Sequence, residues 1–482
     1  MQQRSSAGEL AEELRREFER YSPGGKLPSS RALVERYRVS PVTVSRALAR
    51  LTAQGLVVTR PGAGAYRAAP AATPPRAGDT SWQQIALSAE AAQGLPRSVD
   101  AGGVLATLAE PPLGVIEFNG GYPHPSLQPL QPLSAALARA GRRPGAWGRP
   151  PVEGLPELRD WFARDIGAAG EGSGITAAEV LVTAGGQSAL TTALRALAPP
   201  GAPVLVETPT YPGLLAVARA AGQRPVPVPT DGDGVRPELL EAALRGSGAR
   251  VFVCQPLFHN PTGAVLGAGR RREVIAVARA AGAFVVEDDF ARRLPHEDAG
   301  ELPAPLVADD PDGVVVHVSS LTKATSSSLR VGALVARGPV LERLRAVQVV
   351  DHFFVSRPLQ EAALELVGSP AWPRHLRALS ARLRERRGAL AGALERLLPG
   401  IAPATLPRGG YHAWLTLPED VPETALHAAA LREGVALAPG RPYHPAEPGA
   451  GHVRISFAGV ADPAEIAEGV RRTARAFAAV RG

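Results

Sequence analysis

The chain has 482 residues, of which 45% are hydrophobic and 21% charged, so it is long enough for a large core and two or more domains. The sequence contains no run of about 18 or more apolar residues, so no membrane span is predicted. The N-terminal stretch has charges where a signal peptide would be apolar. We therefore expect a cytoplasmic protein. The single cysteine, Cys254, excludes an internal disulfide framework and a cysteine-based zinc site.

The net charge of +7 is concentrated at the front of the chain. Residues 1–68 hold 12 Lys and Arg against 6 Asp and Glu, which leaves 41 against 40 for the remainder. A small basic unit ahead of a nearly neutral one favours a polyanionic partner such as double-stranded DNA. A solvated basic face without a partner has the same composition and remains the alternative.

The first 68 residues are predicted to form three short helices and two strands. Apolar residues at helical spacing indicate helices within 8–21 and 29–39. A third helix is predicted from Pro41, with Ser40 as its N-cap and Gly55 at its end. The tight turn before it is typical of a helix-turn-helix, whose second helix enters a DNA major groove. Two strands around a Pro-Gly turn then predict a wing.

The segment KLPSSRALVERYRVSPVTVSRALARLTAQGLVVTRPGAGAYR resembles the winged helix-turn-helix of the GntR family of bacterial repressors. The resemblance implies that Arg31 contacts a phosphate or base edge. It further implies that the recognition helix and wing approach DNA through Ser40, Thr43, Ser45, Arg46, Arg60, Gly62 and Gly64. Pro41 and Ser45 stand where many relatives carry arginines that contact guanine, so the operator sequence is not predicted. A winged helix kept for protein contacts is the alternative.

Residues 69–112 are predicted to be a linker that contains two Pro-rich stretches and a helical stretch after residue 81. From residue 113 to 482, apolar strand-like runs alternate with helical ones. This alternation predicts an α/β domain with a largely parallel sheet. Ligands of such sheets bind at the carboxyl ends of the strands.

Three polar clusters follow predicted strands of this domain. Gly185 and Gly186 precede a helix, whose free N–H groups suit a phosphate, although a plain turn has the same sequence. Asn260 in FHNPTG offers an amide at a strand end, with a simple Asn-Pro turn as the alternative. The acidic strand end VVEDDF needs a cationic partner, which is a ring nitrogen, an arginine or a metal. A metal has the least support because no His or Cys stands beside these acids.

A fourth cluster surrounds Lys323, one of only two lysines among 53 basic residues. Unlike arginine, lysine can lose its proton when desolvated and then attack a carbonyl. Ser320, Thr322 and Arg330 stand close to it in sequence and can hold a phosphate. The cluster therefore suits an aldehyde phosphate. The alternative is that this lysine is a chance survivor of compositional drift toward arginine.

The succession of NPTG, an acidic strand end and S-x-x-K-x6-R resembles the fold-type I, aspartate-aminotransferase-like proteins over residues 115–480. The resemblance implies that pyridoxal phosphate forms a Schiff base with Lys323, pairs with Asp288 through its ring nitrogen, and contacts Asn260 and Tyr211. Its phosphate would be held by Gly185, Gly186, Gln187, Ser320 and Arg330. No metal site is expected.

Two further positions bear on the ligand and the chemistry. Arg454 matches the arginine that grips a substrate α-carboxylate, and a surface strand-end arginine is the alternative. Phe290 stands where related proteins commonly have a tyrosine that donates to the ring oxygen. Since phenylalanine cannot donate, the site is less well tuned for turnover.

A winged helix fused to an aminotransferase-like domain resembles the MocR subfamily of GntR regulators. The resemblance implies a transcriptional regulator that senses pyridoxal phosphate or a small amino compound, as a homodimer with exchanged domains. Two alternatives remain open. One is an active pyridoxal-phosphate-dependent aminotransferase with an accessory DNA-binding domain, and the other is a regulator whose large domain binds no cofactor and serves only for dimerisation. The effector, the operator, the target genes and the sign of regulation are not predicted.

Overall fold

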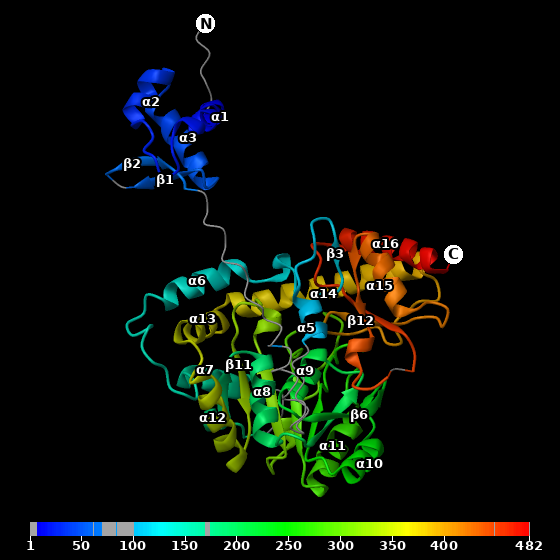
Figure 1. Ribbon diagram of the computed structural model, residues 1–482. Helices are drawn as coiled ribbons and strands as arrows, with labels where there is room; N and C mark the ends of the chain where they lie inside the picture. Colours follow the sequence, from blue (N-terminus) through cyan, green and yellow to red (C-terminus); the bar gives the residue numbers. More distant parts are fainter. Residues whose placement is uncertain are drawn as a thin grey trace. The chain divides into compact units, whose positions relative to one another are not determined.

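The computed structural model describes residues 7–60, 62–69, 83, 101–168, 174–447 and 449–481. The chain divides into two compact units, residues 1–89 and 90–482, which are described separately (Figure 1). Of the predicted linker, residues 70–82 and 84–100 lie outside the described residues. Within the described residues, the helical stretch predicted after residue 81 appears as one short helix, α5 (Gly102–Leu108).

The N-terminal unit is a winged helix-turn-helix, as predicted. Its elements are α1 (Ala7–Arg16), the 3-10 turn η1 (Glu17–Arg20), α2 (Ser30–Tyr37), α3 (Pro41–Ala53) and the antiparallel strands β1 (Val57–Arg60) and β2 (Gly64–Arg67). The helix predicted over 8–21 ends early, at Arg16. Side chains from all three helices and from β1 share one core, which includes Leu10, Leu33, Val44 and Val57.

The turn between α2 and α3 is shaped by its capping residues. Arg38 follows α2 in the left-handed conformation, at φ 51°. The Ser40 hydroxyl oxygen then accepts the backbone N–H of Thr43 at 3.1 Å, which confirms Ser40 as the N-cap of α3. Pro41 at the first helical position needs no hydrogen-bond partner for its nitrogen. These local features direct α3 away from α2.

The large unit is built on an eight-stranded sheet in the order β4-β11-β10-β9-β8-β5-β6-β7 (Figure 1). The strands are β4 (Val180–Thr183), β5 (Pro203–Thr208), β6 (Arg224–Asp231), β7 (Gly234–Val235), β8 (Val251–Cys254), β9 (Phe284–Asp289), β10 (Val315–Ser320) and β11 (Gly332–Val335). The neighbours from β10 to β6 are parallel, whereas β11 and β7 pair antiparallel with their neighbours. This is the largely parallel sheet that the alternating sequence predicts.

Helices cover both faces of the sheet, which makes three layers. One face packs on α8 (Gly186–Leu197), α9 (Pro212–Ala220) and α12 (Pro339–His352). The other helices of the unit are α6 (Leu130–Ala140), α7 (Pro156–Gly167), α10 (Pro237–Ser247), α11 (Ala268–Ala280), α13 (Arg357–Val367), α14 (Ala371–Leu397), α15 (Glu423–Arg432) and α16 (Pro463–Arg481). None of the helices in the described ranges is long and apolar enough to cross a membrane.

A smaller region forms at the end of the chain. Its three-stranded sheet has the order β12-β15-β14, formed by β12 (His412–Thr416), β15 (His452–Ser456) and β14 (Ala438–Pro439). A separate pair joins β13 (Val435–Ala436) to β3 (Ile116–Glu117) from the start of the unit. This region brings β15 close to the carboxyl ends of the large sheet, where a ligand pocket is expected.

Candidate functional site

A pocket opens at the carboxyl ends of the parallel strands. The structure brings together there the residues predicted from six separate stretches of sequence: Gly186, Gln187, Tyr211, Asn260, Asp288, Ser320, Lys323, Arg330 and Arg454. Gly185 lies directly behind this lining, at φ +85°, and a Cβ atom there would come within 3.1 Å of the Arg330 guanidinium carbon. Both the backbone and the close approach therefore require glycine.

One end of the pocket has the features of an anion site. The helix α8 begins there at Gly186, with the backbone N–H groups of its first turn available. Arg330 has no carboxylate partner among the described residues, and the buried Thr322 hydroxyl has no hydrogen-bond partner among them. An unpaired guanidinium, a helix N-terminus and an unused hydroxyl together fit a phosphate group.

Lys323 lies at the centre of the pocket, in the short 3-10 turn that follows β10. Its Nζ donates to the Gly121 carbonyl at 2.8 Å and lies 3.9 Å from the ring centroid of Tyr122. Burial, together with the positive charges of Arg454 and Arg330, lowers the Lys323 pKa to about 7, against the opposing effect of Asp288. Much of the amine is therefore neutral near neutral pH and able to act as a nucleophile.

Asp288 is the last residue but one of β9, where it is buried and is held by a residue that the sequence analysis missed. The Gln255 side chain donates from Nε2 to Asp288 Oδ2 at 2.6 Å, and its Oε1 accepts the backbone N–H of Asn260 at 3.0 Å. Burial, which outweighs the bond from Gln255, raises the Asp288 pKa to about 6. A buried carboxyl of this kind is stabilised when a ligand in the pocket offers it a cationic or hydrogen-bond-donating partner.

Arg454 of β15 is 2% exposed, so the alternative of a surface strand-end arginine is wrong. Its Nη1 donates to Asn260 Oδ1 at 3.3 Å, and its Nη2 donates to the backbone carbonyls of Asn119 and Gly120. Its Nε is buried without a partner among the described residues. A buried guanidinium with a free donor and no carboxylate beside it is suited to an anionic ligand.

Several aromatic residues of the pocket were not found from the sequence. Tyr122 and Tyr411 come from loops, His412 from β12 and Tyr443 from the 3-10 turn η7 (Arg441–Tyr443). No motif links them to Lys323. The predicted Tyr211 lies in the pocket and donates to Gln187 Oε1 at 3.1 Å. Phe290 also lines the pocket. At the position where related proteins commonly have a tyrosine, this pocket therefore has a phenyl ring and no hydroxyl donor.

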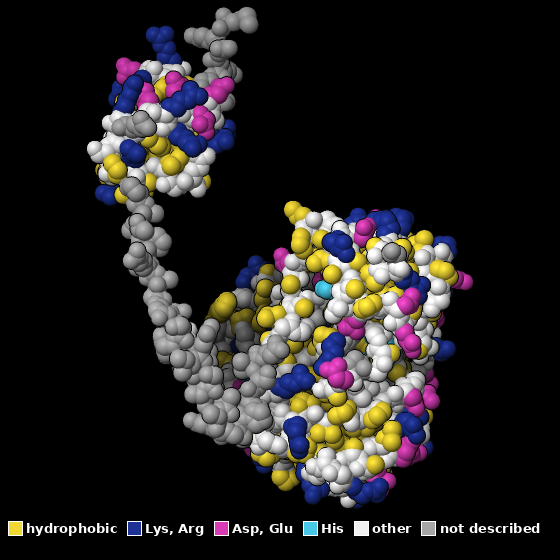
Figure 2. All heavy atoms as spheres, turned by 45° about the vertical axis from the view of Figure 1, so that its right-hand side comes forward, with side chains coloured by type: hydrophobic (Ala, Val, Ile, Leu, Met, Phe, Trp, Pro, Cys, Tyr) yellow, Lys and Arg dark blue, Asp and Glu magenta, His cyan; other side chains and the backbone are white. Residues whose placement is uncertain are grey.

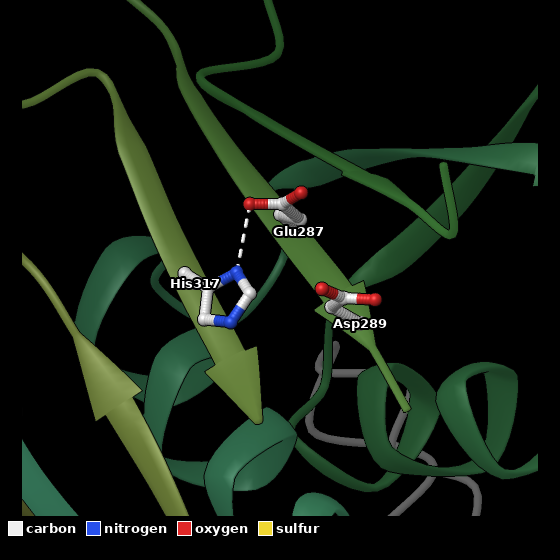
Figure 3. Close-up of side chains that lie close together, drawn as sticks. All are labelled: Glu287, Asp289 and His317. Carbon is white, nitrogen blue, oxygen red and sulfur yellow. Dashed lines mark hydrogen bonds and ion pairs between the residues drawn. The ribbon is translucent and has the colours of Figure 1, made fainter. Parts of the chain in front are cut away.

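A buried group of ionisable residues, Glu287, Asp289 and His317, lies on β9 and β10 (Figure 3). Because side chains alternate along a strand, Glu287 and Asp289 lie on the opposite face of β9 from Asp288. Glu287 and Asp289 point to one side, and His317 of β10 lies with its Nδ1 2.8 Å from Glu287 Oε2. Burial favours a raised Glu287 pKa, but His317 and the Leu306 N–H hold that pKa below its ordinary value. Asp289 is paired with Arg292 at 2.6 Å.

This arrangement corrects one step of the sequence analysis, which found no histidine beside the acidic strand end. The strand pairing places His317 directly opposite Glu287, although the two are far apart in sequence. Asp289 is already paired with Arg292, and Glu287 already has the His317 imidazole within hydrogen-bond distance. The absence of a metal site therefore stays a prediction, and these existing partners are its physical basis.

The predicted DNA-binding side chains lie on the surface of the N-terminal unit. Arg31, Ser45, Arg46 and Arg60 are exposed, and dark-blue basic side chains are visible over this unit in Figure 2. The Ser40 and Thr43 hydroxyls lie 2.8 Å apart and are already engaged in the cap of α3.

The wing carries the remaining residues of the predicted surface. Gly62 and Gly64 have φ values of +72° and +106°, which favour glycine. The Arg60 guanidinium lies 4.7 Å from the ring centroid of Tyr66 across the wing.

Comparison with known proteins assigns both units. Residues 118–472 match the family described as aminotransferase class I and II, and residues 7–66 match the bacterial regulatory proteins of the gntR family. The HTH-type transcriptional regulator TauR of Rhodobacter capsulatus is 31% identical over 472 residues, which are 95% of this chain and 93% of that protein. The HTH-type regulator YdcR of Escherichia coli is 30% identical over 91% of this chain and 92% of its own length.

The chain belongs to the MocR subfamily of GntR-family regulators. Its large unit also resembles enzymes. The 2-aminoadipate transaminase of Thermus thermophilus is 33% identical over 76% of this chain and 90% of that protein. The crystal structure of the α-aminoadipate aminotransferase LysN from Thermus thermophilus superposes with a TM-score of 0.73 at 30% identity, covering 83% of this regulator and 99% of LysN. The fold is thus fold type I, and the family indicates pyridoxal phosphate as the cofactor.

Proposed function

We propose that this DNA-binding transcriptional regulator binds pyridoxal phosphate through Lys323 and senses pyridoxal phosphate or a small amino compound in the same pocket. One observation supports the proposal most strongly. The only lysine of the large unit lies in a pocket with two arginines, Arg330 and Arg454, that have no carboxylate partner among the described residues. Burying such cations is costly unless an anionic ligand completes them.

The residues of the pocket fit each part of the cofactor. The phosphate would be held by the first turn of α8 with Gly185, Gly186, Gln187, Ser320 and Arg330. Asp288 would hold the ring nitrogen, Asn260 the ring oxygen and Tyr211 the ring face. When bound, pyridoxal phosphate supplies an electrophilic carbonyl and an electron-withdrawing ring. Lys323 provides the neutral amine, and Gln255 keeps one Asp288 oxygen fixed by its hydrogen bond.

The partners follow from the two units. The exposed Arg46 and wing residues are proposed to contact double-stranded operator DNA in the cytoplasm. Paired half-sites need paired recognition helices, so we propose a homodimer with exchanged domains. An effector changes DNA binding only if it binds two arrangements of that dimer with different affinities. Arg454 is the proposed contact for a carboxylate of the effector.

The second candidate function is an active aminotransferase, and the completeness of the pocket favours it. Lys323, Asp288, Asn260 and Arg330 are all present. Against it stands Phe290, which brings no hydroxyl to the ring oxygen. The unpaired arginines argue against the third hypothesis, a cofactor-free scaffold.

The deciding experiment follows the visible absorbance of the purified protein with pyridoxal phosphate while amino acids and amines are added. A band that shifts and then persists, accompanied by altered DNA affinity, is expected for a sensor. A band that decays to the pyridoxamine form with release of a keto acid would establish the aminotransferase instead. A protein that never acquires a band would contradict both.

The Lys323 pKa gives a pH prediction for the cofactor-free protein. Because burial lowers this pKa to about 7, the neutral amine forms as the pH rises through about 7 rather than near 10.5. The rate of band formation with added pyridoxal phosphate is therefore expected to rise from pH 6 to pH 8 and then level off. Stopped-flow absorbance measures it, and a rate that continues to rise to pH 10 would contradict the lowered pKa.

Arg46→Ala tests the DNA-binding surface. We expect it to weaken binding to operator DNA by about 5- to 150-fold, because one arginine contact to a base edge contributes about 1–3 kcal/mol. The DNA is selected from a random library with the wild-type protein, and affinity is measured by fluorescence anisotropy. Arg15→Ala, which removes another exposed arginine, on α1, is the control. Equal affinities of the Arg46→Ala and wild-type proteins would show that α3 is not the recognition helix.

A further inference from the structure

The charged side chains of the pocket are few, and the proposed function uses all of them. Among the described residues that line it, they are Asp288, Lys323, Arg330 and Arg454. In the proposed function, Asp288 holds the ring nitrogen and Lys323 binds the carbonyl carbon. Arg330 holds the phosphate, and Arg454 holds the ligand carboxylate. His412 also lines the pocket, but burial and the nearby Arg454 hold its pKa well below the ordinary value, so the imidazole is neutral. No charge among them remains for the side chain of an amino acid ligand.

One wall of the pocket is a helix that the sequence analysis did not connect with the site. Val104, Thr107 and Leu108 of α5 line the pocket, at the spacing of three and four residues that defines one helix face. The Thr107 hydroxyl donates to the Val104 carbonyl at 2.8 Å, so its donor is used within the helix. This face therefore offers the ligand apolar contact. Leu105 belongs to another face and is 61% exposed.

The wall is held in place beside Arg454. The Asn119 side chain donates from Nδ2 to the Ala106 carbonyl of α5 at 2.6 Å, while the backbone carbonyl of Asn119 accepts from Arg454. On its other side α5 contacts α9 (Figure 1). A Cβ atom on Gly103 would lie 3.2 Å from Pro442 Cβ. A ligand gripped by Arg454 thus meets a preformed apolar surface rather than one that must be ordered.

We propose that the compound recognised here is an α-amino acid with an uncharged, apolar side chain, selected by the Val104, Thr107 and Leu108 face of α5. The inference rests on the proposed function, which supplies the roles of the four charged residues. A charged side chain would lie against this apolar face with no counter-charge left among the described residues that line the pocket, which is unfavourable. Arg219 and Arg441 line the neighbouring pocket and not this one, and Arg441 is paired with Glu447 at 2.9 Å.

The test compares leucine with aspartate, whose side chains branch alike and differ in charge. The full-length protein, loaded with pyridoxal phosphate, is titrated with each compound, and binding is followed by the shift of the visible band and by calorimetry. We expect leucine to bind at least about 100-fold more tightly than aspartate. Aspartate binding as tightly as leucine, with the cofactor band intact, would overturn this inference and leave the proposed function standing. Failure to form any cofactor band would overturn both.

Variants locate the selectivity on α5. Val104→Arg places a cation on the pocket face and is expected to reverse the preference toward aspartate. Leu105→Arg places the same charge on the exposed face one residue away and is expected to keep the preference for leucine. Leu108→Arg serves as the second pocket-face variant if Val104→Arg does not acquire the cofactor band. An unchanged leucine preference in a pocket-face variant that binds the cofactor would overturn the role of α5.

Discussion

Lys323→Ala is expected to abolish the covalent attachment of pyridoxal phosphate completely. The large unit contains no other lysine, so no second amine of this kind lies in the pocket. The chain also provides a matched control, because its only other lysine, Lys26, is exposed in the N-terminal unit. After borohydride reduction and proteolysis, mass spectrometry should find the pyridoxyl group on the Lys323 peptide in the wild type and in Lys26→Ala, and nowhere in Lys323→Ala.

The fold of Lys323→Ala should persist. The substitution removes one hydrogen bond to the Gly121 carbonyl, which still accepts the Tyr411 hydroxyl at 2.8 Å, so the loss costs about 0.5–1.5 kcal/mol. It also removes an amine whose charged form is disfavoured by burial, which offsets part of that cost. Circular dichroism should therefore be unchanged. A borohydride-reducible adduct retained in the large unit of a folded Lys323→Ala protein would disprove the assignment of Lys323.

Arg454→Ala is expected to remove recognition of the ligand carboxylate. Truncating one partner of a buried, hydrogen-bonded charge pair costs about 3–5 kcal/mol, which corresponds to a loss of roughly 150- to 5000-fold in affinity. Alanine and ethylamine form a suitable pair of probes because they differ only in the carboxylate. The wild type should prefer alanine strongly, and the variant should bind the two about equally, as measured by the shift of the visible band.

Two controls separate this effect from general damage. The cofactor band of Arg454→Ala should form normally, since Lys323, Arg330 and Asp288 remain in place. Arg454→Lys should recover only part of the alanine preference, because a lysine keeps the charge without the planar pair of donors. A preference for alanine that survives in Arg454→Ala would show that another group binds the carboxylate.

The sequence by itself determined the features that depend on neighbouring residues. The Ser40 cap, Pro41 at the start of α3 and the glycines of the wing specify the winged helix within a short segment. The alternation of apolar runs with helical ones specifies the parallel sheet, with Asp288 near the end of β9 and Lys323 in the turn that follows β10. These signals are local, so they can be followed along the chain without knowledge of packing.

Only the tertiary structure decided which distant residues complete the pocket. Gln255 becomes the partner of Asp288 because β8 pairs with β9, and His317 faces Glu287 because β9 pairs with β10. The burial of Arg454 depends on where the C-terminal region of the unit packs, and the apolar wall depends on where α5 lies. Strand order and packing are set by the sum of many weak contacts across the whole unit, and no short stretch of sequence carries them.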